Sequence, residues 1–569
     1  MLVLCIMKRR NASASGFLIA NEFVNYKIVF RVALGLLIIA TFVTRTHSMG
    51  QSLWADEAWV ANAILEPSIA ESIYYHSWLQ TSPPLFLILN RLVIRVLGLS
   101  NETLRFFTVV IGTASVVPMI YIACRLLRPT FALVAIFFFV FSPELVRYTH
   151  ELKQYSSDVF ASLILLGLGL GYINRPSRSL LYFWLATFFG LTFFSYQALI
   201  FIPGFFLIIL VGFYKTACQI NKKAATRKWL DPVAVVLCGL IAATVNYFIF
   251  IKPNKQAILD LFWTMGFFHG ENVWGLLKFD THEFLRLASL IFLTDLQSKP
   301  YVLQILICSV LLVGLGTLYA RGLLYDEKLL NQALFLSMPI LSIYGLNVVK
   351  FYPLGTIRLM LFLTPIIIIL FVYGLESISY GLSTVISTAG QKDTFQNTVG
   401  VTSLILLIPL LWIHFGLKGA SPLFRSEPVE DSERAVRYLS ERVQPADVVY
   451  VHASMREQFK LYSRMMPPFS ATIIWGNIGW PCCPRDVSFD RLGEIDSMLP
   501  PEMAKLEIPA KKSALWLLFS DRSGYWSKFG RQGPGIFEHW LTSNGCLRAE
   551  LVPLRGARID KYRCNRNLA

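Results

Sequence analysis

Two adjacent carboxylates, Asp56 and Glu57, lie in the segment SLWADEAWVANAI (52–64), among aromatic and aliphatic residues and soon after a strongly apolar run. An ionised carboxylate near a lipid boundary is costly unless water, a cation or another partner compensates its charge. A carboxylate held there can accept the proton of a hydroxyl nucleophile as a new bond forms. The alternative interpretation is a solvated acid pair or the first turn of a helix.

A second charged motif, PELVRYTHELKQYSSD (143–158), follows two apolar runs later. Glu151, Tyr155 and Asp158 recur at i, i+4 and i+7, which predicts one polar side of a helix that enters the next apolar run. On this helix Lys153 points to a different side. We expect the polar side to face the first-loop acids; the alternative is a charged helix cap with an internal ion pair.

Cationic side chains outside the apolar runs form a third group. Lys and Arg make charge-assisted hydrogen bonds to phosphate and neutralise a phosphate leaving group. Other cations only extend to lipid headgroups. The residues expected on the same face as the acids are Arg91, Arg95, Arg105, Arg147, Lys153, Lys350 and Arg358. A subset that converges near the acids would hold a phosphate.

Two histidines and one tyrosine complete the candidate set. His269 and His282 supply titratable donors in the segment 252–300, or are ordinary loop histidines. Tyr352 precedes Pro353 in a short turn, where its hydroxyl serves as a lid or its ring belongs to an interfacial aromatic belt.

Composition shows which elements must position these residues. Of 569 residues, 55% are hydrophobic and only 15% are charged, which is typical of a polytopic membrane protein. The net charge of +16 is dispersed between the apolar runs and does not gather on one soluble face. Nucleic acid is therefore not the expected partner, and anionic membrane lipid is.

The apolar runs predict a bundle of about eleven transmembrane helices. With the N-terminus cytoplasmic, the basic short loops near Arg125, Arg175 and Lys215 all fall inside, as the positive-inside rule requires. We interpret 82–101, which carries internal charges, as an amphipathic helix in the outer interface. The spans are expected near 28–47, 105–127, 130–147, 158–174, 179–197, 198–214, 232–251, 301–320, 332–349, 357–378 and 399–418.

Three regions follow: a cytoplasmic N-terminus (1–27), a transmembrane domain (28–419) and an extracytoplasmic tail (420–569). In the tail, DVVYVHA and SALWLLFS indicate buried strands and DSERAVRYLSERV an amphipathic helix, which predicts a small α/β or α+β domain. Cys546 and Cys564 could pair in an oxidising compartment. No CxxC spacing is present, so zinc is not expected.

Together, the Asp-Glu pair, the Pro-Pro-Leu helix, the span LRFFTVVIGTASVVPMIYIACRLL, the loop FSPELVRYTHELKQYS and the external tail resemble the GT-C superfamily of integral membrane glycosyltransferases. The likeness is to the bacterial branch related to protein O-mannosyltransferases and lipid A aminoarabinose transferases. It is specific through about residues 50–175, weaker to 420 and mainly positional in the tail.

The resemblance implies transfer of a sugar from a polyprenyl-phosphate donor to an acceptor hydroxyl at the outer face of the plasma (inner) membrane, with inversion. Asp56 matches the acid that acts as general base or orients the acceptor, and Glu57 its supporting neighbour. Either Glu151 or Asp158 matches the family's second acid, so the catalytic candidates are Asp56, Glu57 and Asp158. Candidates for binding the donor phosphate or substrate are Arg147, Glu151, Lys153, Tyr155, His269, Tyr352 and Arg358.

No glycine-rich nucleotide loop is present, which agrees with a lipid-linked donor. Some relatives use a divalent metal and others do not; we favour a site with no cofactor. The acceptor is a glycan, a lipid or a protein. The main alternative is a transporter or flippase of lipid-linked saccharides, which would show half-repeats and charges within spans. A lipid-linked saccharide polymerase or ligase is a third candidate.

Overall fold

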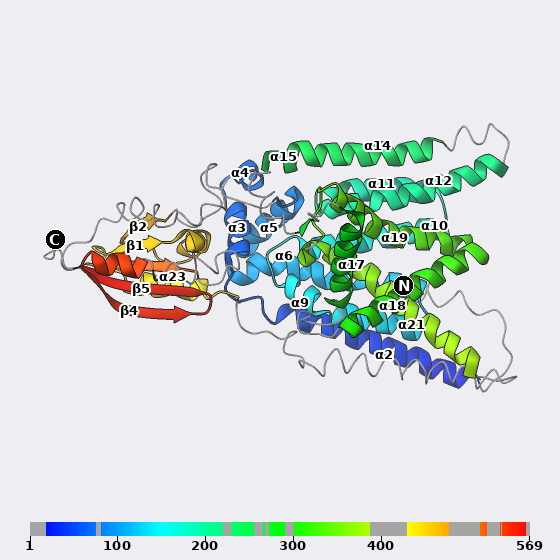
Figure 1. The fold of residues 1–569 in the computed structure, drawn as a ribbon, viewed down its shortest axis with the longest axis horizontal. Helices are drawn as coiled ribbons and strands as arrows, with labels where there is room; N and C mark the ends of the chain where they lie inside the picture. The colour runs from blue at the N-terminus through cyan, green and yellow to red at the C-terminus, as the bar shows by residue number, and fades with distance from the viewer. Residues whose placement is uncertain are drawn as a thin grey trace.

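The protein is described by a computed structural model that covers residues 19–75, 81–219, 229–254, 266–267, 272–290, 301–354, 356–386, 429–476, 513–520, 535 and 537–564. It consists of a bundle of long apolar helices, a layer of short helices at one end, and a small sheet domain beyond that layer (Figure 1). We call the end of the bundle that faces the sheet domain the domain end.

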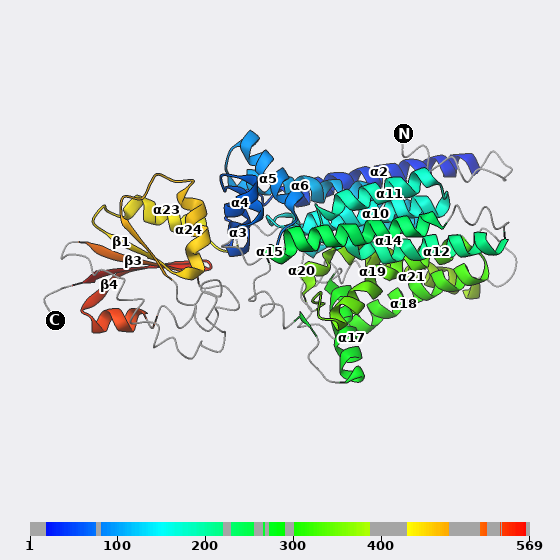
Figure 2. The same ribbon diagram turned by 90° about the horizontal axis from the view of Figure 1, so that it is seen from above.

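The bundle contains eight described helices that are long and apolar enough to cross a membrane, or nine if the bent pair α8 and α9 forms one span. These run roughly side by side (Figure 2). Its elements are α2 (Ile19–Thr46), α6 (Asn101–Ala114), α7 (Val116–Leu126), α8 (Pro129–Val140), α9 (Pro143–Thr149), α10 (Tyr155–Asn174), α11 (Arg178–Thr192), η1 (Tyr196–Phe201), α12 (Ile202–Gln219), α14 (Leu230–Val245), η2 (Asn246–Ile251), α15 (Lys252–Asn254), α17 (Val273–Leu290), α18 (Tyr301–Leu324), α19 (Glu327–Val348), α20 (Ile357–Met360), η4 (Leu361–Leu363) and α21 (Thr364–Ile386).

The helices confirm a polytopic membrane fold, with differences from the eleven predicted spans. The run predicted at 179–197 forms α11, which has 15 residues and is shorter than a full membrane crossing. The run at 399–418 lies outside the described residues. Helices α8 and α9 meet at an angle of 47°, because Pro143 starts a new helix and removes one backbone donor.

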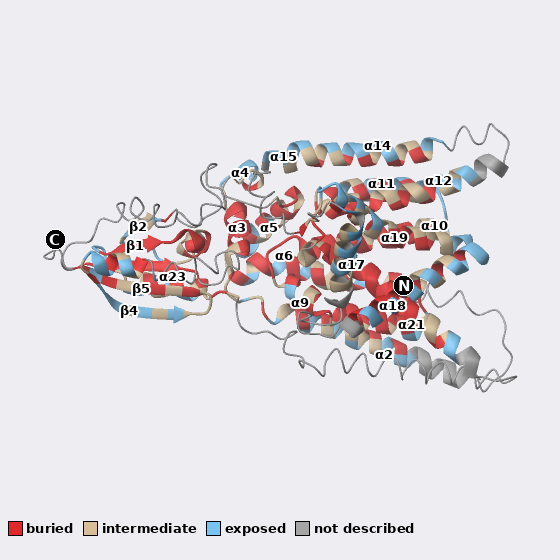
Figure 3. Cartoon of the chain, in the orientation of Figure 1, coloured by how far each residue is buried: buried red, intermediate tan, exposed pale blue. Residues whose placement is uncertain are grey.

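Two spans lie at the centre of the bundle. Of the 18 most apolar consecutive residues in each span, 72% are buried in the span formed by α10, and 89% in the span built from α20, η4 and α21. Buried residues line both spans in Figure 3. Helix α21 also packs very closely on α18. A Cβ atom at Gly314 would overlap the carbonyl oxygen of Leu370, and one at Gly374 would overlap that of Val310. Small residues allow such contact between membrane helices.

Three short helices cover the domain end of the bundle: α3 (Ala55–Ile64), α4 (Ile69–Ile73) and α5 (Pro84–Leu97). Helix α5 is the element predicted within 82–101, and Pro84 occupies its first turn, where a missing N–H costs nothing. Arg91 of α5 is buried and donates hydrogen bonds to the carbonyl oxygens of Ile64, Glu66 and Pro67. It thereby fixes the C-terminal end of α3.

The tail forms the predicted α/β domain. Its sheet has the order β2-β1-β3-β5-β4, in which β1 is parallel to β2 and β3, and the remaining pairs are antiparallel. The strands are β1 (Val448–Val451), β2 (Thr472–Trp475), β3 (Ala514–Phe519), β4 (Cys546–Leu554) and β5 (Ala557–Cys564); the helices are α23 (Ser432–Arg442), η5 (Ala453–Met455) and α24 (Arg456–Ser463). The strands and helix that the sequence predicted are all confirmed.

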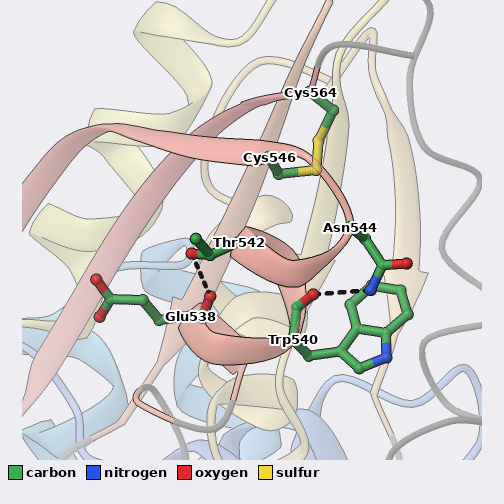
Figure 4. The surroundings of a disulfide bond; sticks show 6 residues. All are labelled: Glu538, Trp540, Thr542, Asn544, Cys546 and Cys564. Carbon is green, nitrogen blue, oxygen red and sulfur yellow. Dashed lines mark hydrogen bonds between the residues drawn. A yellow bond between two sulfur atoms is a disulfide. The ribbon is translucent and has the colours of Figure 1, made fainter. Parts of the chain in front are cut away.

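Cys546 and Cys564 form a disulfide, as the sequence suggested (Figure 4). They are the terminal register pair of the β4–β5 hairpin. The bond therefore closes the open end of the sheet's outer hairpin. The adjacent Cys482 and Cys483 lie outside the described residues.

Candidate active site

Helix α3 places both first-loop acids in its first turn, where the positive end of the helix dipole favours carboxylates. The side chains of Asp56 and Glu57 are both largely buried, but they point to different partners. Asp56 pairs with Arg358 of α20, and Glu57 pairs with Arg105 of α6. The adjacent acids therefore have separate partners.

Glu57 is a structural anchor. Its Oε2 accepts a hydrogen bond from Arg105 Nη2 at 2.6 Å, and its Oε1 accepts from Arg105 Nε at 2.8 Å and from the Leu152 amide at 2.8 Å. The pair is almost fully buried. Glu57 therefore ties α3 to α6 and to the second loop, and it supports Asp56 without itself being placed as a proton acceptor.

We expect Glu57→Gln to destabilise the protein by about 3–5 kcal/mol, because it leaves the buried Arg105 guanidinium without its counter-charge. Thermal unfolding in detergent measures this. The control is Glu102→Gln, an exposed position on the same helix as Arg105, where the change should stay within about 0.5 kcal/mol. Equal melting temperatures for the two variants would contradict the anchoring role.

The ion pair between Asp56 and Arg358 forms the centre of the site. Arg358 Nη1 lies 2.7 Å from Asp56 Oδ2, although 302 residues separate the two in the chain. Both side chains keep a small exposed fraction, 12% for Asp56 and 16% for Arg358. A small substrate group can therefore reach them, while most of the surrounding water is excluded.

Two second-loop residues complete this cluster. The side chain of Lys153 is fully buried and lies within electrostatic range of Asp56. Burial lowers the pKa of its ammonium group to about 8, and the negative charge of Asp56 opposes that shift. Glu151 lies 3.5 Å from Arg147, measured from Oε1 to Nε. Burial raises the pKa of Glu151 to about 7, against the attraction of Arg147.

The local geometry of the second loop differs from the helix that its spacing predicted. Helix α10 begins only at Tyr155, and residues 151–154 form a tight bend. The bend arises because the Leu152 amide donates to Glu57 and the Lys153 amide donates to the carbonyl oxygen of Glu151. Glu151 thus lies off the helix. Lys153 also precedes the helix, so the prediction that it lies on another side of that helix is wrong.

Asp158 lies in a second polar group, deeper in α10. It is buried and hydrogen-bonded to Ser195, and it lies within electrostatic range of Tyr352. Gln197 Nε2 donates to the Tyr352 hydroxyl at 3.1 Å, and that hydroxyl donates to the Leu359 carbonyl at 2.9 Å. Because Leu359 follows Arg358, this group supports the short helix that carries the central arginine.

The remaining candidates are dispersed. Tyr155 is buried beside Tyr148 and lies within electrostatic range of Arg358. His282 is exposed on α17, with Nδ1 3.3 Å from Glu283, and His269 lies outside the described residues. Arg95 and Lys350 are also exposed.

Sequence reasoning missed one acid, Glu430 in the tail. Its Oε2 accepts a hydrogen bond from the Ala55 amide at 3.1 Å, and its charge acts on Asp56. No spacing rule could reveal a contact between residues 375 positions apart. Its position just before the predicted amphipathic helix was the sole local signal.

The arrangement can do acid–base and phosphate chemistry. A carboxylate with limited water access can accept a proton, and a guanidinium and an ammonium can hold a phosphate beside it. In the described part of the chain, no three His, Cys, Asp or Glu side chains gather as metal ligands would. Both first-loop acids are paired with arginine.

No protein-family model matches the sequence, and no curated protein matches it. Solved structures do match. ArnT from Cupriavidus metallidurans aligns with a TM-score of 0.51 at 12% identity, covering 95% of this chain and 98% of that one. The same protein bound to undecaprenyl phosphate aligns at 0.51 and 10% identity, over 94% and 98% of the two chains.

The oligosaccharyltransferase of Archaeoglobus fulgidus, tethered to an acceptor peptide, aligns with a TM-score of 0.50 at 10% identity, over 87% of this chain and 69% of that one. ArnT and this enzyme are both GT-C proteins. The superpositions show a shared fold, although few residues are identical. The chain therefore has the fold of these two GT-C proteins.

Proposed function

We propose that the protein is a glycosyltransferase of the plasma (inner) membrane, which transfers a sugar from a polyprenyl-phosphate donor to an acceptor hydroxyl at the outer face. The observation that carries this proposal is the partly accessible Asp56–Arg358 pair with the Lys153 ammonium near it. It combines a proton acceptor and phosphate-binding cations at the domain end of a GT-C bundle. ArnT bound to undecaprenyl phosphate supports a lipid phosphate as the donor carrier.

In the proposed reaction the acceptor oxygen attacks the anomeric carbon from the face opposite the phosphate, which inverts the configuration. The bond between that carbon and the phosphate oxygen breaks, and its electron pair leaves with the polyprenyl phosphate. Asp56 takes the proton from the acceptor hydroxyl. Arg358 and Lys153 stabilise the negative charge that develops on the phosphate, so no general acid is required.

Before the donor binds, Asp56 is paired with Arg358. When the donor binds, its phosphate competes for the Arg358 guanidinium, which matches phosphate oxygens in a bidentate manner. Asp56 is then released to accept a proton. Binding of the donor and readiness of the base are thereby coupled through one arginine.

The experiment supplies the purified protein with labelled polyprenyl-phosphate sugars and an outer-envelope extract as the source of glycan, lipid or protein acceptors. We expect label to move from the carrier to an acceptor through a new glycosidic bond. If saccharide lipids instead cross reconstituted vesicles and no new bond forms, the protein is a transporter and the proposal is wrong.

We further expect donor binding to weaken as the pH rises. The donor is a phosphodiester whose charge is constant between pH 6 and 9. Lys153, with its pKa lowered by burial to about 8, loses its positive charge in that range, and Glu151, with its pKa raised to about 7, becomes negative. Both changes oppose phosphate binding above their pKa. The donor KM should rise about tenfold, the effect of one charge-assisted hydrogen bond.

Steady-state kinetics at constant ionic strength measures this rise. Lys153→Arg keeps its charge to high pH and should flatten the part of the profile above pH 8. A donor KM that is independent of pH in the wild type would remove Lys153 from the phosphate site.

A further inference from the structure

Glu430 brings a carboxylate of the sheet domain to the start of the helix that carries Asp56. It lies just before α23 and is only 2% exposed. Its Oε2 accepts hydrogen bonds from the Ala55 amide at 3.1 Å and from Gln458 Nε2 at 2.9 Å, and its Oε1 accepts from Ser520 Oγ at 3.4 Å. The carboxylate is therefore held by groups from two domains.

The contact with Ala55 has a specific structural meaning. Ala55 is the first residue of α3, and the amides of a first helical turn have no partner within their own helix. The residue before it, Trp54, has no side-chain oxygen with which to cap the helix. Glu430 supplies the missing acceptor from a distant part of the chain, one residue away from Asp56.

A buried carboxylate that accepts the hydrogen bond at this position costs electrostatic free energy, because burial disfavours its charged form. Burial raises the pKa of Glu430 to about 7, its three hydrogen bonds oppose that shift, and the nearby charge of Asp56 adds to it. An apolar residue would avoid this cost but would leave the Ala55 amide unsatisfied. The contact is thus one that the fold maintains against electrostatic repulsion.

The domain also holds the far end of α3. Asn62 Nδ2 donates to Glu457 Oε2 at 2.9 Å, and the Tyr75 hydroxyl donates to the same oxygen at 3.0 Å. Between the two ends, apolar residues of α3 share one buried core with residues of α23 and α24, among them Trp59, Val436 and Leu461. Helix α3 is accordingly packed as part of the sheet domain as well as of the bundle.

We infer that Glu430 is a positioning residue of the active site, through which the sheet domain fixes the first turn of α3 and hence the place of Asp56 relative to Arg358. The consequence for catalysis rests on the proposed function. The structural part does not: without Glu430, the first turn of α3 frays while its far end stays docked.

The test compares three variants of the full-length protein. Glu430→Ala removes the acceptor. Glu430→Gln keeps an amide oxygen for Ala55 and Gln458 and turns its NH₂ towards Ser520, whose hydroxyl can accept. Glu457→Ala is the matched control, because it removes a buried carboxylate of the same domain from the opposite end of α3.

Hydrogen–deuterium exchange without substrate gives the first readout. We expect faster exchange of the Ala55 amide in Glu430→Ala, and rates near wild type in Glu430→Gln and Glu457→Ala. If the Ala55 amide exchanges at the wild-type rate in Glu430→Ala, the inference is wrong, whatever reaction the protein catalyses.

Kinetics gives the second readout. We expect Glu430→Ala to lower kcat up to about 100-fold, because a base displaced by about 1 Å loses that much, with the donor KM within about twofold of wild type. Glu430→Gln should recover most of kcat, and Glu457→Ala should keep it per folded molecule. Equal losses of kcat in Glu430→Ala and Glu457→Ala would assign Glu430 a merely structural role. Absence of transfer in the wild type would instead overturn the proposed function and leave the exchange result standing.

Discussion

Asp56→Asn abolishes most sugar transfer, with an expected loss in kcat of about 10²–10⁴-fold, the usual contribution of a positioned general base. The amide has nearly the same shape as the carboxylate, so α3 and its docking remain intact. It cannot accept the proton of the acceptor hydroxyl. Turnover of labelled donor by purified protein measures the loss.

The same substitution should leave the donor KM unchanged or lower it. In the wild type, Asp56 competes with the donor phosphate for Arg358, since its carboxylate lies 2.7 Å from the guanidinium. Asparagine competes less, because it carries no charge. Glu66→Gln, on the same loop but paired with Arg464 at 3.8 Å, is the control and should retain normal kcat. If Asp56→Asn turns over as fast as this control, Asp56 is not the base.

Arg358→Ala is the second large effect. It should reduce kcat/KM by about 10²–10³-fold, comparable to the loss of one preorganised donor to a developing anion. Both the phosphate contact and the stabilisation of the leaving group disappear. Arg358→Lys should recover only part of this loss, because an ammonium cannot present the bidentate fork of a guanidinium.

Inhibition by the free polyprenyl phosphate separates binding from chemistry. We expect its inhibition constant to rise by at least about tenfold in Arg358→Ala, as for a lost charge-assisted hydrogen bond. Lys350→Ala removes an exposed cation from the turn that precedes α20 and should leave the constant unchanged. Equal inhibition constants in these two variants would show that Arg358 does not bind the phosphate.

Most of the fold could be predicted because its signals are local. Long apolar runs, Pro at a helix start and the short, continuously apolar strands in the tail each depend on neighbours along the chain. The exceptions are also local in origin. The apolar run at 179–197 predicts a span, yet the helix that forms there, α11, has only 15 residues.

The site was less accessible to sequence reasoning because it is built from distant residues. Asp56 and Arg358 were both candidates, but nothing in their spacing showed that they pair. The helical pattern grouped Glu151 with Asp158, whereas the structure separates them. The Leu152 amide binds Glu57 and thereby delays the start of α10. Glu430 was missed because its contact crosses from one domain to another.

The glycine contact between α18 and α21 has a consequence for how a lipid carrier could reach this site. A prenyl tail stays in the bilayer, so a phosphate attached to it must approach sideways, between two helices. At Gly314 and Gly374 the backbones leave no room for even one methyl group. Lateral entry is closed at that contact, so in the proposed reaction the tail of the carrier would pass between other helices of the bundle.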